Sequence, residues 1–260
     1  MTTPPVPPLY RDVDFNGPLS DARAAGLIRD LGRLEGRRIV DIGCGWAELL
    51  LRALESEPTA TGFGIDLDEQ AVEHGRANAV ARGLADRVEL AVGDAGAWSG
   101  THADVVVNNG ASHVWGGDPV THTVNALEAV AGLLRPGGRF LFGECFWLRD
   151  PTPGELEAMT DIPRAQYRSL PDLVDLALSH GFRLRALSQA TLEEWDDFES
   201  RHARGWEEWL ERNPGSPGAD EVRARADRHR HFWLRGTRET LGFAYLSLAR
   251  VPRSQKCRCR

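Results

Sequence analysis

The chain has 260 residues, of which 42% are hydrophobic, with a formal net charge of −7 at pH 7 and an isoelectric point near 5.7. This length and composition allow one large core, which excludes disordered and fibrous classes. A protein that holds nucleic acid through its phosphates needs a basic face, so the acidic balance argues against nucleic-acid partners and favours a small or cationic substrate.

The sequence carries no targeting or membrane signal. No apolar run approaches the roughly 20 residues that a membrane-spanning helix needs, and the start MTTPPVPPLY lacks the basic and apolar regions of a signal peptide. We therefore expect a cytoplasmic protein without membrane contact. Neither the pair Cys44 and Cys145, in apolar contexts, nor the pair Cys257 and Cys259 indicates a disulfide framework or a zinc site. Residues 252–260 are predicted to be a disordered basic tail.

The first 36 residues are predicted to form an arm and a helix. The chain is Pro-rich through Pro8, and the first helix is expected where Ser20 can cap the run DARAAGLIRDLGRL, which is apolar on one face. Residues 1–19 are expected to form an arm that precedes this helix.

From Arg37 onward, short β-branched runs alternate with helical stretches. The predicted strands are RRIVDIG, TGFGID, RVELAV, ADVVVNN and GGRFLFGECFW, the last of which follows the turn LRPGG. The predicted helices between them run from 46 to 56, from 69 to 80, and onward from Pro119, where Asp118 can act as the cap. This alternation is typical of a parallel sheet.

The C-terminal third is predicted to hold two more strands with an insertion between them. A capping box at 169–172 begins the helix LPDLVDLALSH, which ends at Gly181, and the strands FRLRALSQA and LGFAYLSLAR follow. Between these strands, 192–212 and 220–238 are polar, Trp- and Arg-rich helical stretches. We interpret 192–238 as a helical cap over the carboxyl edge of a sheet domain formed by 37–191 and 239–251. A homodimer surface is the alternative.

The strongest chemical signal is IVDIGCGWAELLL, a strand that ends in an acidic residue and a Gly-x-Gly turn before a helix. Gly43 and Gly45 lack a Cβ, so the chain can turn tightly and a ligand can approach the backbone. Asp41 can accept a hydrogen bond from a cationic amine. A dinucleotide site would have a third glycine where this chain has Glu48, whose carboxylate would oppose a diphosphate, so NAD is disfavoured.

Two further strands end in carboxylates. Asp66 closes TGFGID about 20 residues after the glycine turn, where it can hold both hydroxyls of a ribose. Asp94 follows the next strand and can accept from an adenine amino group, with Ala95 beside it and Trp98 near the ring. Three acidic strand ends in register are far more specific than any one of them.

These residues resemble the class I S-adenosylmethionine (SAM)-dependent methyltransferase family from about Arg37 to Arg250, with DIGCG, GIDLD, GDA and LRPGG matching its motifs. The resemblance implies an α/β, Rossmann-like, doubly wound, seven-stranded, mostly parallel sheet with an antiparallel last strand, plus the cap between strands six and seven. It also implies SAM as cofactor. The expected cofactor-binding residues are Asp41, Gly43 and Gly45 at the methionine end, Asp66 and Leu67 at the ribose, Asp94 and Ala95 at the adenine, and Asn109.

The loop VNNGASHVWGGD after the fourth strand is the expected acceptor side. His113 is our candidate general base, because imidazole titrates near neutral pH, and Glu144 after the fifth strand is a second catalytic candidate. Trp115, Trp147 and Tyr10 of the arm are expected to contact substrate. DNA adenine-amino methyltransferases resemble one another in an Asn/Asp-Pro-Pro-aromatic sequence at this place, from which NNGA departs.

We therefore expect methyl transfer to a small-molecule acceptor at oxygen, nitrogen or carbon. FNGPLS, NNGASH and the cap resemble a bacterial small-molecule methyltransferase subgroup. This resemblance implies that Tyr10, Phe15 and Asn16 of the arm fold across the cofactor as a lid, with an exposed arm as the alternative. The alternatives are a SAM-binding regulatory or partner protein without transferase activity, and an NAD-dependent oxidoreductase. No metal is expected, since His229 and His231 lie two residues apart in a helix and face different directions.

Overall fold

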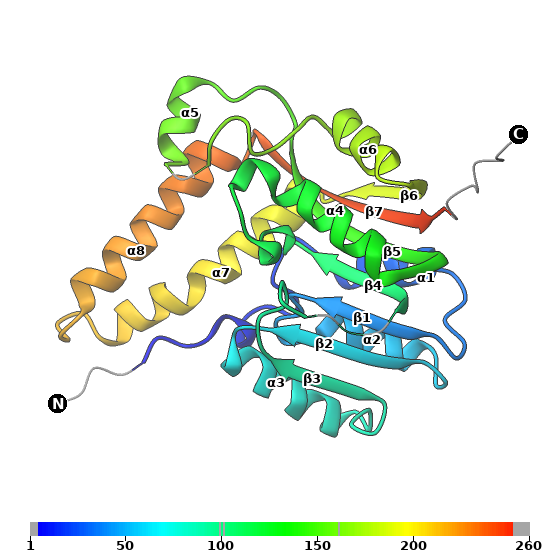
Figure 1. Cartoon of the computed structure of the whole chain (residues 1–260). Helices are drawn as coiled ribbons and strands as arrows, with labels where there is room; N and C mark the ends of the chain where they lie inside the picture. Colours follow the sequence, from blue (N-terminus) through cyan, green and yellow to red (C-terminus); the bar gives the residue numbers. More distant parts are fainter. Residues whose placement is uncertain (1–4, 99, 101, 161, 252–260) are drawn as a thin grey trace, which may run out of the picture.

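The computed structural model describes residues 5–98, 100, 102–160 and 162–251, so the predicted tail at 252–260 lies outside the described residues. One seven-stranded sheet, with the order β3-β2-β1-β4-β5-β7-β6, forms the centre of the chain (Figure 1). None of the described helices is long and apolar enough to cross a membrane. The strands are β1 (Arg38–Ile42), β2 (Thr61–Asp66), β3 (Val88–Val92), β4 (Ala103–Asn109), β5 (Leu134–Trp147), β6 (Phe182–Gln189) and β7 (Leu241–Arg250).

The pairing confirms the expected sheet. Strands β1 to β5 run parallel to one another, whereas β7 is antiparallel to both β5 and β6. The central strand β4 is buried along six of its seven residues, because helices cover both faces of a doubly wound sheet and only apolar runs suit such a position.

Two apolar layers hold the helices against the sheet. One face packs on α1 (Asp21–Asp30), α2 (Glu48–Ser56) and α3 (Glu69–Ala81). The other packs on α4 (His122–Leu133) and α6 (Leu170–Ser179). Ser20, Asp68 and Ser169 cap α1, α3 and α6 through hydrogen bonds to backbone N–H groups, as such residues do at helix starts.

Several element boundaries differ from the sequence prediction. Helix α2 begins at Glu48 rather than at Trp46, because Ala47 adopts a left-handed conformation with φ of 60°. The predicted turn LRPGG lies within β5, next to a register shift in its pairing with β4. The short helix α5 (Pro153–Ala158) was not predicted, although Thr152 and Glu155 form a capping box there.

The insertion between β6 and β7 consists of α7 (Leu192–Arg212) and α8 (Ala219–His231), followed by the π-helical segment η4 (Phe232–Thr237). The two long helices extend beyond the sheet on the side where β1, β2 and β4 end (Figure 1). The last turns of the insertion are π-helical, whereas the sequence predicted one helical stretch over 220–238.

Glu194 joins the N-terminal segment to the insertion. It is the third residue of the α7 capping box with Thr191, accepts 2.6 Å from the Ser20 hydroxyl and forms a 2.7 Å ion pair with Arg23. Burial opposes the charge of this carboxylate, but the hydrogen bonds from Arg23 and Ser20 hold its pKa at about 2. The start of α1 and the start of α7 are therefore fixed to each other.

We predict that Glu194→Gln lowers the free energy of unfolding by about 1–2 kcal/mol at pH 7, through the loss of charge-assisted hydrogen bonds and part of a helix cap. The folded pKa lies below the usual 4.5, so this stabilisation is present above pH 4.5 and is lost as pH falls toward 2. Urea titrations from pH 7 to pH 3 measure it. Glu193→Gln, at the exposed neighbour, is the control, and an equal loss in both variants would refute the role of Glu194.

Candidate functional site

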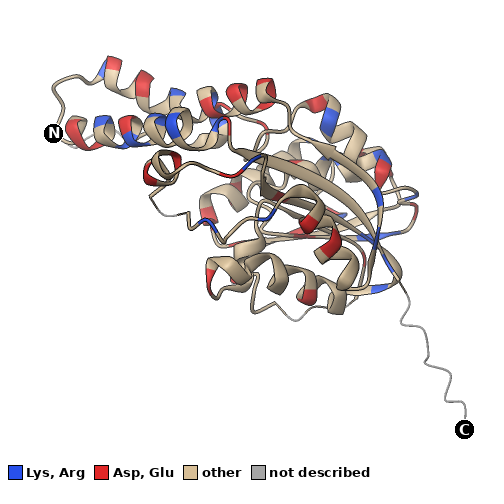
Figure 2. Cartoon of the chain, turned by 90° about the horizontal axis from the view of Figure 1, so that it is seen from above, with Lys and Arg blue, Asp and Glu red and all other residues tan. Residues whose placement is uncertain are grey.

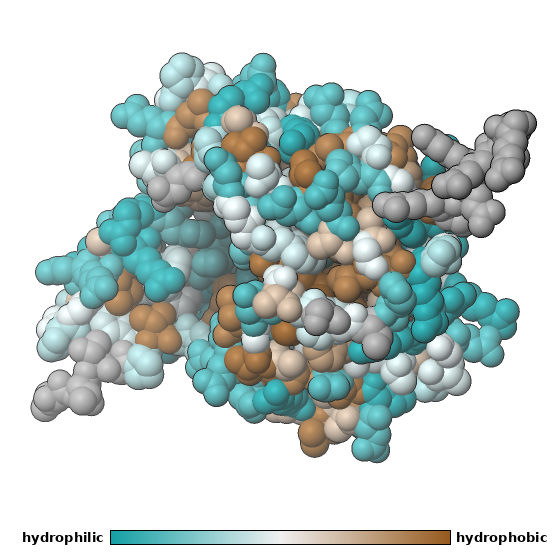
Figure 3. Space-filling model, viewed as in Figure 1, coloured by the Kyte–Doolittle hydropathy of each residue, from teal (hydrophilic) through white to brown (hydrophobic). Residues whose placement is uncertain are grey.

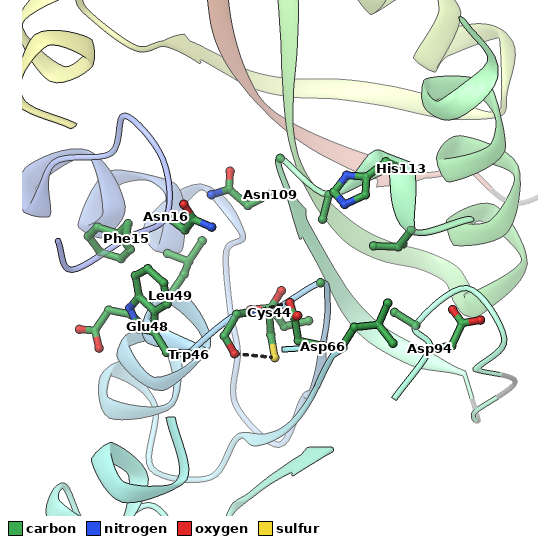
Figure 4. A pocket seen from close by; sticks show the side chains of 18 residues that line it. Phe15, Asn16, Cys44, Trp46, Glu48, Leu49, Asp66, Asp94, Asn109 and His113 are labelled. Carbon is green, nitrogen blue, oxygen red and sulfur yellow. Dashed lines mark hydrogen bonds between the residues drawn. The ribbon is translucent and has the colours of Figure 1, made fainter. Parts of the chain in front are cut away.

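A pocket of about 390 Å³ lies at the carboxyl ends of β1, β2 and β4. Figure 4 shows Phe15 and Asn16 on one side of it, His113 and Asp94 on the other, and Asp66 between them. The pocket brings together all eight residues that the sequence placed in the cofactor set: Asp41, Gly43, Gly45, Asp66, Leu67, Asp94, Ala95 and Asn109.

The turn after β1 makes space for a ligand. Gly43 and Gly45 have positive φ angles of 72° and 54°, which favour glycine. A Cβ at Gly43 would lie 2.4 Å from the Cβ of Ala111, so the turn after β1 and the loop after β4 approach more closely than any side chain allows. The Gly45 N–H donates to the Asp66 carboxylate at 2.7 Å and thereby fixes that side chain at the pocket.

Asp41 has the most perturbed carboxyl group of the pocket. Its exposed fraction is 4%, and burial together with the charge of Asp66 raises its pKa to about 8. The neutral acid is favoured at pH 7 unless a cation lies beside it. This is the behaviour expected of a side chain that binds a cationic amine.

The other two strand-end carboxylates are oriented by their own loops. Asp66 accepts a second hydrogen bond, at 2.9 Å, from the N–H of Asp68, and Asp94 accepts at 2.8 Å from the N–H of Gly96. Each carboxylate retains lone pairs that a ligand can use. Trp98, by contrast, stacks on Phe63 at 4.8 Å in the core and does not line the described pocket.

The end of β4 contributes two asparagines. Asn108 is fully buried, and its amide donates to the backbone oxygens of Ile42 and Ala111 at 2.9 and 3.0 Å, which ties the loop after β4 to the end of β1. The Asn109 side-chain oxygen is buried over Gly143 of β5 and has no hydrogen-bond partner among the described residues, although Asn109 as a whole lines the pocket. No pattern in the sequence indicated the role of Asn108.

Glu48 corrects one argument of the sequence analysis. Its carboxylate is 7% exposed and forms 2.6 Å ion pairs with both Arg52 and Arg82. Its charge is therefore balanced inside the protein, and the expectation that it would repel a diphosphate was wrong in its physical reason. Arg82 lies 34 residues further along the chain, so the local motif could not reveal this pairing.

Both catalytic candidates line a second, smaller cavity of about 100 Å³. His113 lines this cavity and the larger pocket, whereas Glu144 lines only the second cavity. Desolvation and the neighbouring His122 lower the pKa of His113. Burial raises the pKa of Glu144 to about 7, although the N–H of Cys145 donates to it at 2.9 Å.

The three residues expected to contact substrate lie outside the described linings of these cavities. Tyr10 stacks on His74 with ring centroids 4.0 Å apart, Trp115 packs against the core layer under α4, and the Trp147 indole donates to the backbone oxygen of Arg164 at 2.9 Å. Of the three arm residues expected at the cofactor, Phe15 and Asn16 line the larger pocket and Tyr10 does not.

Comparisons with known proteins identify the family. A family model described as a methyltransferase domain matches residues 34–198. The chain is 28% identical over 236 residues to the uncharacterized protein YjhP of Escherichia coli (strain K12). The alignment spans 90% of this chain and 93% of that protein. SAM-dependent methyltransferases from Geobacter sulfurreducens and Thiobacillus denitrificans, both solved with S-adenosyl-L-homocysteine, superpose with TM-scores of 0.82 and 0.80. Their identities are 28% and 29%, with 92% and 93% of this chain and 95% and 96% of theirs covered.

The chain therefore belongs to the methyltransferase-domain family. It is a SAM-dependent methyltransferase of class I, and its cofactor is S-adenosyl-L-methionine. The pocket fits this molecule, because the glycine turn leaves room for it and buried Asp41 suits its amino group. The NAD alternative is thereby excluded.

We predict that Gly43→Ala weakens S-adenosylhomocysteine binding more than tenfold, because the new methyl group displaces the loop at Ala111. Gly83→Ala is the matched control, since Gly83 also has a positive φ, 67°, but a Cβ there meets no atom within 4 Å. Both variants lose about 1 kcal/mol of stability from backbone strain. Calorimetric titration measures the affinities, and similar affinities for the two variants would contradict the close-approach argument.

We also predict that Asp41→Asn stabilises the ligand-free protein at pH 8 by about 1–3 kcal/mol while weakening S-adenosylhomocysteine binding. The folded pKa of about 8 exceeds the ordinary 3.8 of the unfolded chain. The resulting loss of folding free energy is therefore absent below pH 4 and increases from pH 4 to pH 8. The advantage of the variant should grow across that range in denaturant titrations. A wild-type protein that is the more stable at pH 8 would refute this account.

Proposed function

We propose that this methyltransferase acts on a small-molecule acceptor bound next to the cofactor pocket. This proposal rests on the second cavity, which shares Gly110 and His113 with the cofactor pocket and therefore adjoins it at the start of the loop after β4. Its volume of about 100 Å³ suits a compact group rather than a polymer. The surface is also hollowed between the α7–α8 pair and the body of the protein (Figure 3).

The charge distribution supports a small acceptor rather than nucleic acid. Figure 2 shows Lys and Arg interleaved with Asp and Glu along the helices, including α7 and α8. Nucleic-acid binding through phosphates depends on a basic stripe or face, which this arrangement does not provide.

Methyl transfer depends more on the position of the acceptor than on stabilisation of charge by the protein. When bound, SAM supplies a methyl group on a positively charged sulfur, and this charge disappears as the acceptor attacks. The residues around the cavities therefore serve to hold the acceptor in line and to keep water out, which lowers the barrier by several kcal/mol. His113, at the rim of both cavities, is placed to accept a proton or to orient the acceptor.

The test is release of S-adenosylhomocysteine when the protein is incubated with SAM and a panel of small hydroxyl, amine and carbon acceptors. We predict turnover with at least one class, and His113→Ala should lower it while leaving S-adenosylhomocysteine affinity within about twofold. His102→Ala, at an exposed histidine away from both cavities, is the control. Full turnover by His113→Ala would remove this residue from the mechanism.

A SAM-binding protein without transfer chemistry is the competing function. It predicts tight binding of SAM and S-adenosylhomocysteine, on the order of −8 kcal/mol, but no turnover with any acceptor. Turnover with any member of the panel decides against it.

A further inference from the structure

The second cavity has a wall that the cofactor pocket does not use. Its lining includes residues from the start of α4 and from β5, and Glu144 on β5 is the only Asp, Glu, Lys or Arg among the described lining residues. One water needs roughly 10–15 Å³ of such space, so about 100 Å³ accommodates a compact group of several non-hydrogen atoms.

Glu144 is a buried carboxylate. Its exposed fraction is 5%, and it accepts from the Cys145 N–H at 2.9 Å, from the Thr123 hydroxyl at a long 3.5 Å and from the Ser112 hydroxyl. The positive charge of Arg168 also favours its ionised form, but no ion pair joins Glu144 to Lys or Arg among the described residues. A buried carboxylate held this way is costly unless a cation or a proton compensates it.

The rest of the lining suits a cation. Two aromatic rings, Tyr167 and Phe243, lie in the wall, and none of the described lining residues is Lys or Arg. Aromatic faces attract ammonium groups, and a carboxylate beside them completes a site for an amine. The titratable neighbours are His113, His122, Cys145 and Tyr167 in the lining, with Arg168 nearby but outside it.

We propose that this cavity binds the protonated head group of a small amine acceptor, and that Glu144 both pairs with the ammonium and removes its proton. The proposal rests on the proposed function, since it names the acceptor class of the same site. Glu144 thus becomes the catalytic residue that removes the proton, and His113, which lines both cavities, orients the acceptor.

The step balances as follows. The ammonium gives one proton to the Glu144 carboxylate, which leaves a neutral amine with a free electron pair. That pair forms the new nitrogen–carbon bond while the carbon–sulfur bond of the cofactor breaks and its electrons stay on sulfur. The products are a methylated ammonium, neutral S-adenosylhomocysteine and protonated Glu144, which then returns its proton to solvent.

The experiment measures binding to the full chain loaded with S-adenosylhomocysteine. The probes are two matched pairs, benzylamine with benzyl alcohol and isobutylamine with isobutanol. Calorimetry or saturation-transfer NMR measures their binding. The variants are Glu144→Gln, which keeps the shape and removes the charge, and Glu128→Gln on the exposed face of α4 as control.

At pH 8 the wild-type protein and Glu128→Gln should bind at least one amine on the order of tenfold more tightly than its matched alcohol. Glu144→Gln should lose this preference while its S-adenosylhomocysteine affinity stays within about twofold, which also shows that it folds.

The preference of the wild-type protein should rise from pH 5.5 to pH 8.5, because Glu144, whose pKa lies at about 7, becomes ionised. His113 and His122 lose their own charge over part of this range. Glu144→Gln retains both histidines, so the difference between its pH dependence and that of the wild-type protein gives the contribution of Glu144 to the amine preference.

The contradicting results are equally definite. Equal binding of amines and alcohols to the wild-type protein, no binding of either amine, or an undiminished preference in Glu144→Gln would each overturn the amine site. Failure of S-adenosylhomocysteine itself to bind would instead overturn the proposed function, so the two failures are distinguishable.

Discussion

The close approach of two loops, the turn after β1 and the loop after β4, is the constraint on which the site depends. Gly43 faces Ala111 at a distance that excludes a side chain, and Asn108 fastens the two loops with hydrogen bonds to Ile42 and Ala111. The strand order changes direction between β1 and β4, and such a switch point leaves a crevice at the carboxyl edge of the sheet. The loop contact therefore sets the floor of the cofactor pocket.

The same edge concentrates carboxyl groups that the fold does not neutralise. Asp41 and Glu144 are both buried, and burial raises the pKa of each. Glu48 shows the contrasting case, in which two arginines balance a buried carboxylate. Functional sites are where proteins accept such unfavourable burial, because the ligand supplies the missing partner. The contrast is between the two carboxyl groups that we propose bind a ligand and a third, Glu48, that is paired within the fold.

Local patterns predicted most of the fold and the cofactor side. Apolar runs marked the strands, Ser20 and Ser169 marked helix starts, and the glycine turn with the acids at 41, 66 and 94 marked the pocket. These signals are short in sequence, and the parallel sheet brings strand ends to one edge whatever the details of packing. The six-residue helix α5 escaped because it is too short to show periodicity.

The acceptor side depends on contacts between distant segments, which the sequence does not display. Tyr10 packs on His74 and Trp147 bonds to Arg164, so neither aromatic ring faces a described cavity, whereas Phe15 does. A lone tryptophan or tyrosine has the same appearance in a sequence whether it fills core or binds substrate. Likewise, no residue adjacent to Glu48 indicates its ion pair with Arg82. No residue beside Asn108 indicates its hydrogen bond to the end of β1.

The most direct test is a crystal structure of the protein with S-adenosylhomocysteine bound. Our account predicts the amino-acid end of the ligand beside Asp41 and the glycine turn, the ribose hydroxyls on Asp66, and the adenine next to Asp94 and Ala95. A ligand bound elsewhere, or in the same pocket with its ends reversed, would contradict the central claim that the three strand ends hold the cofactor in this order.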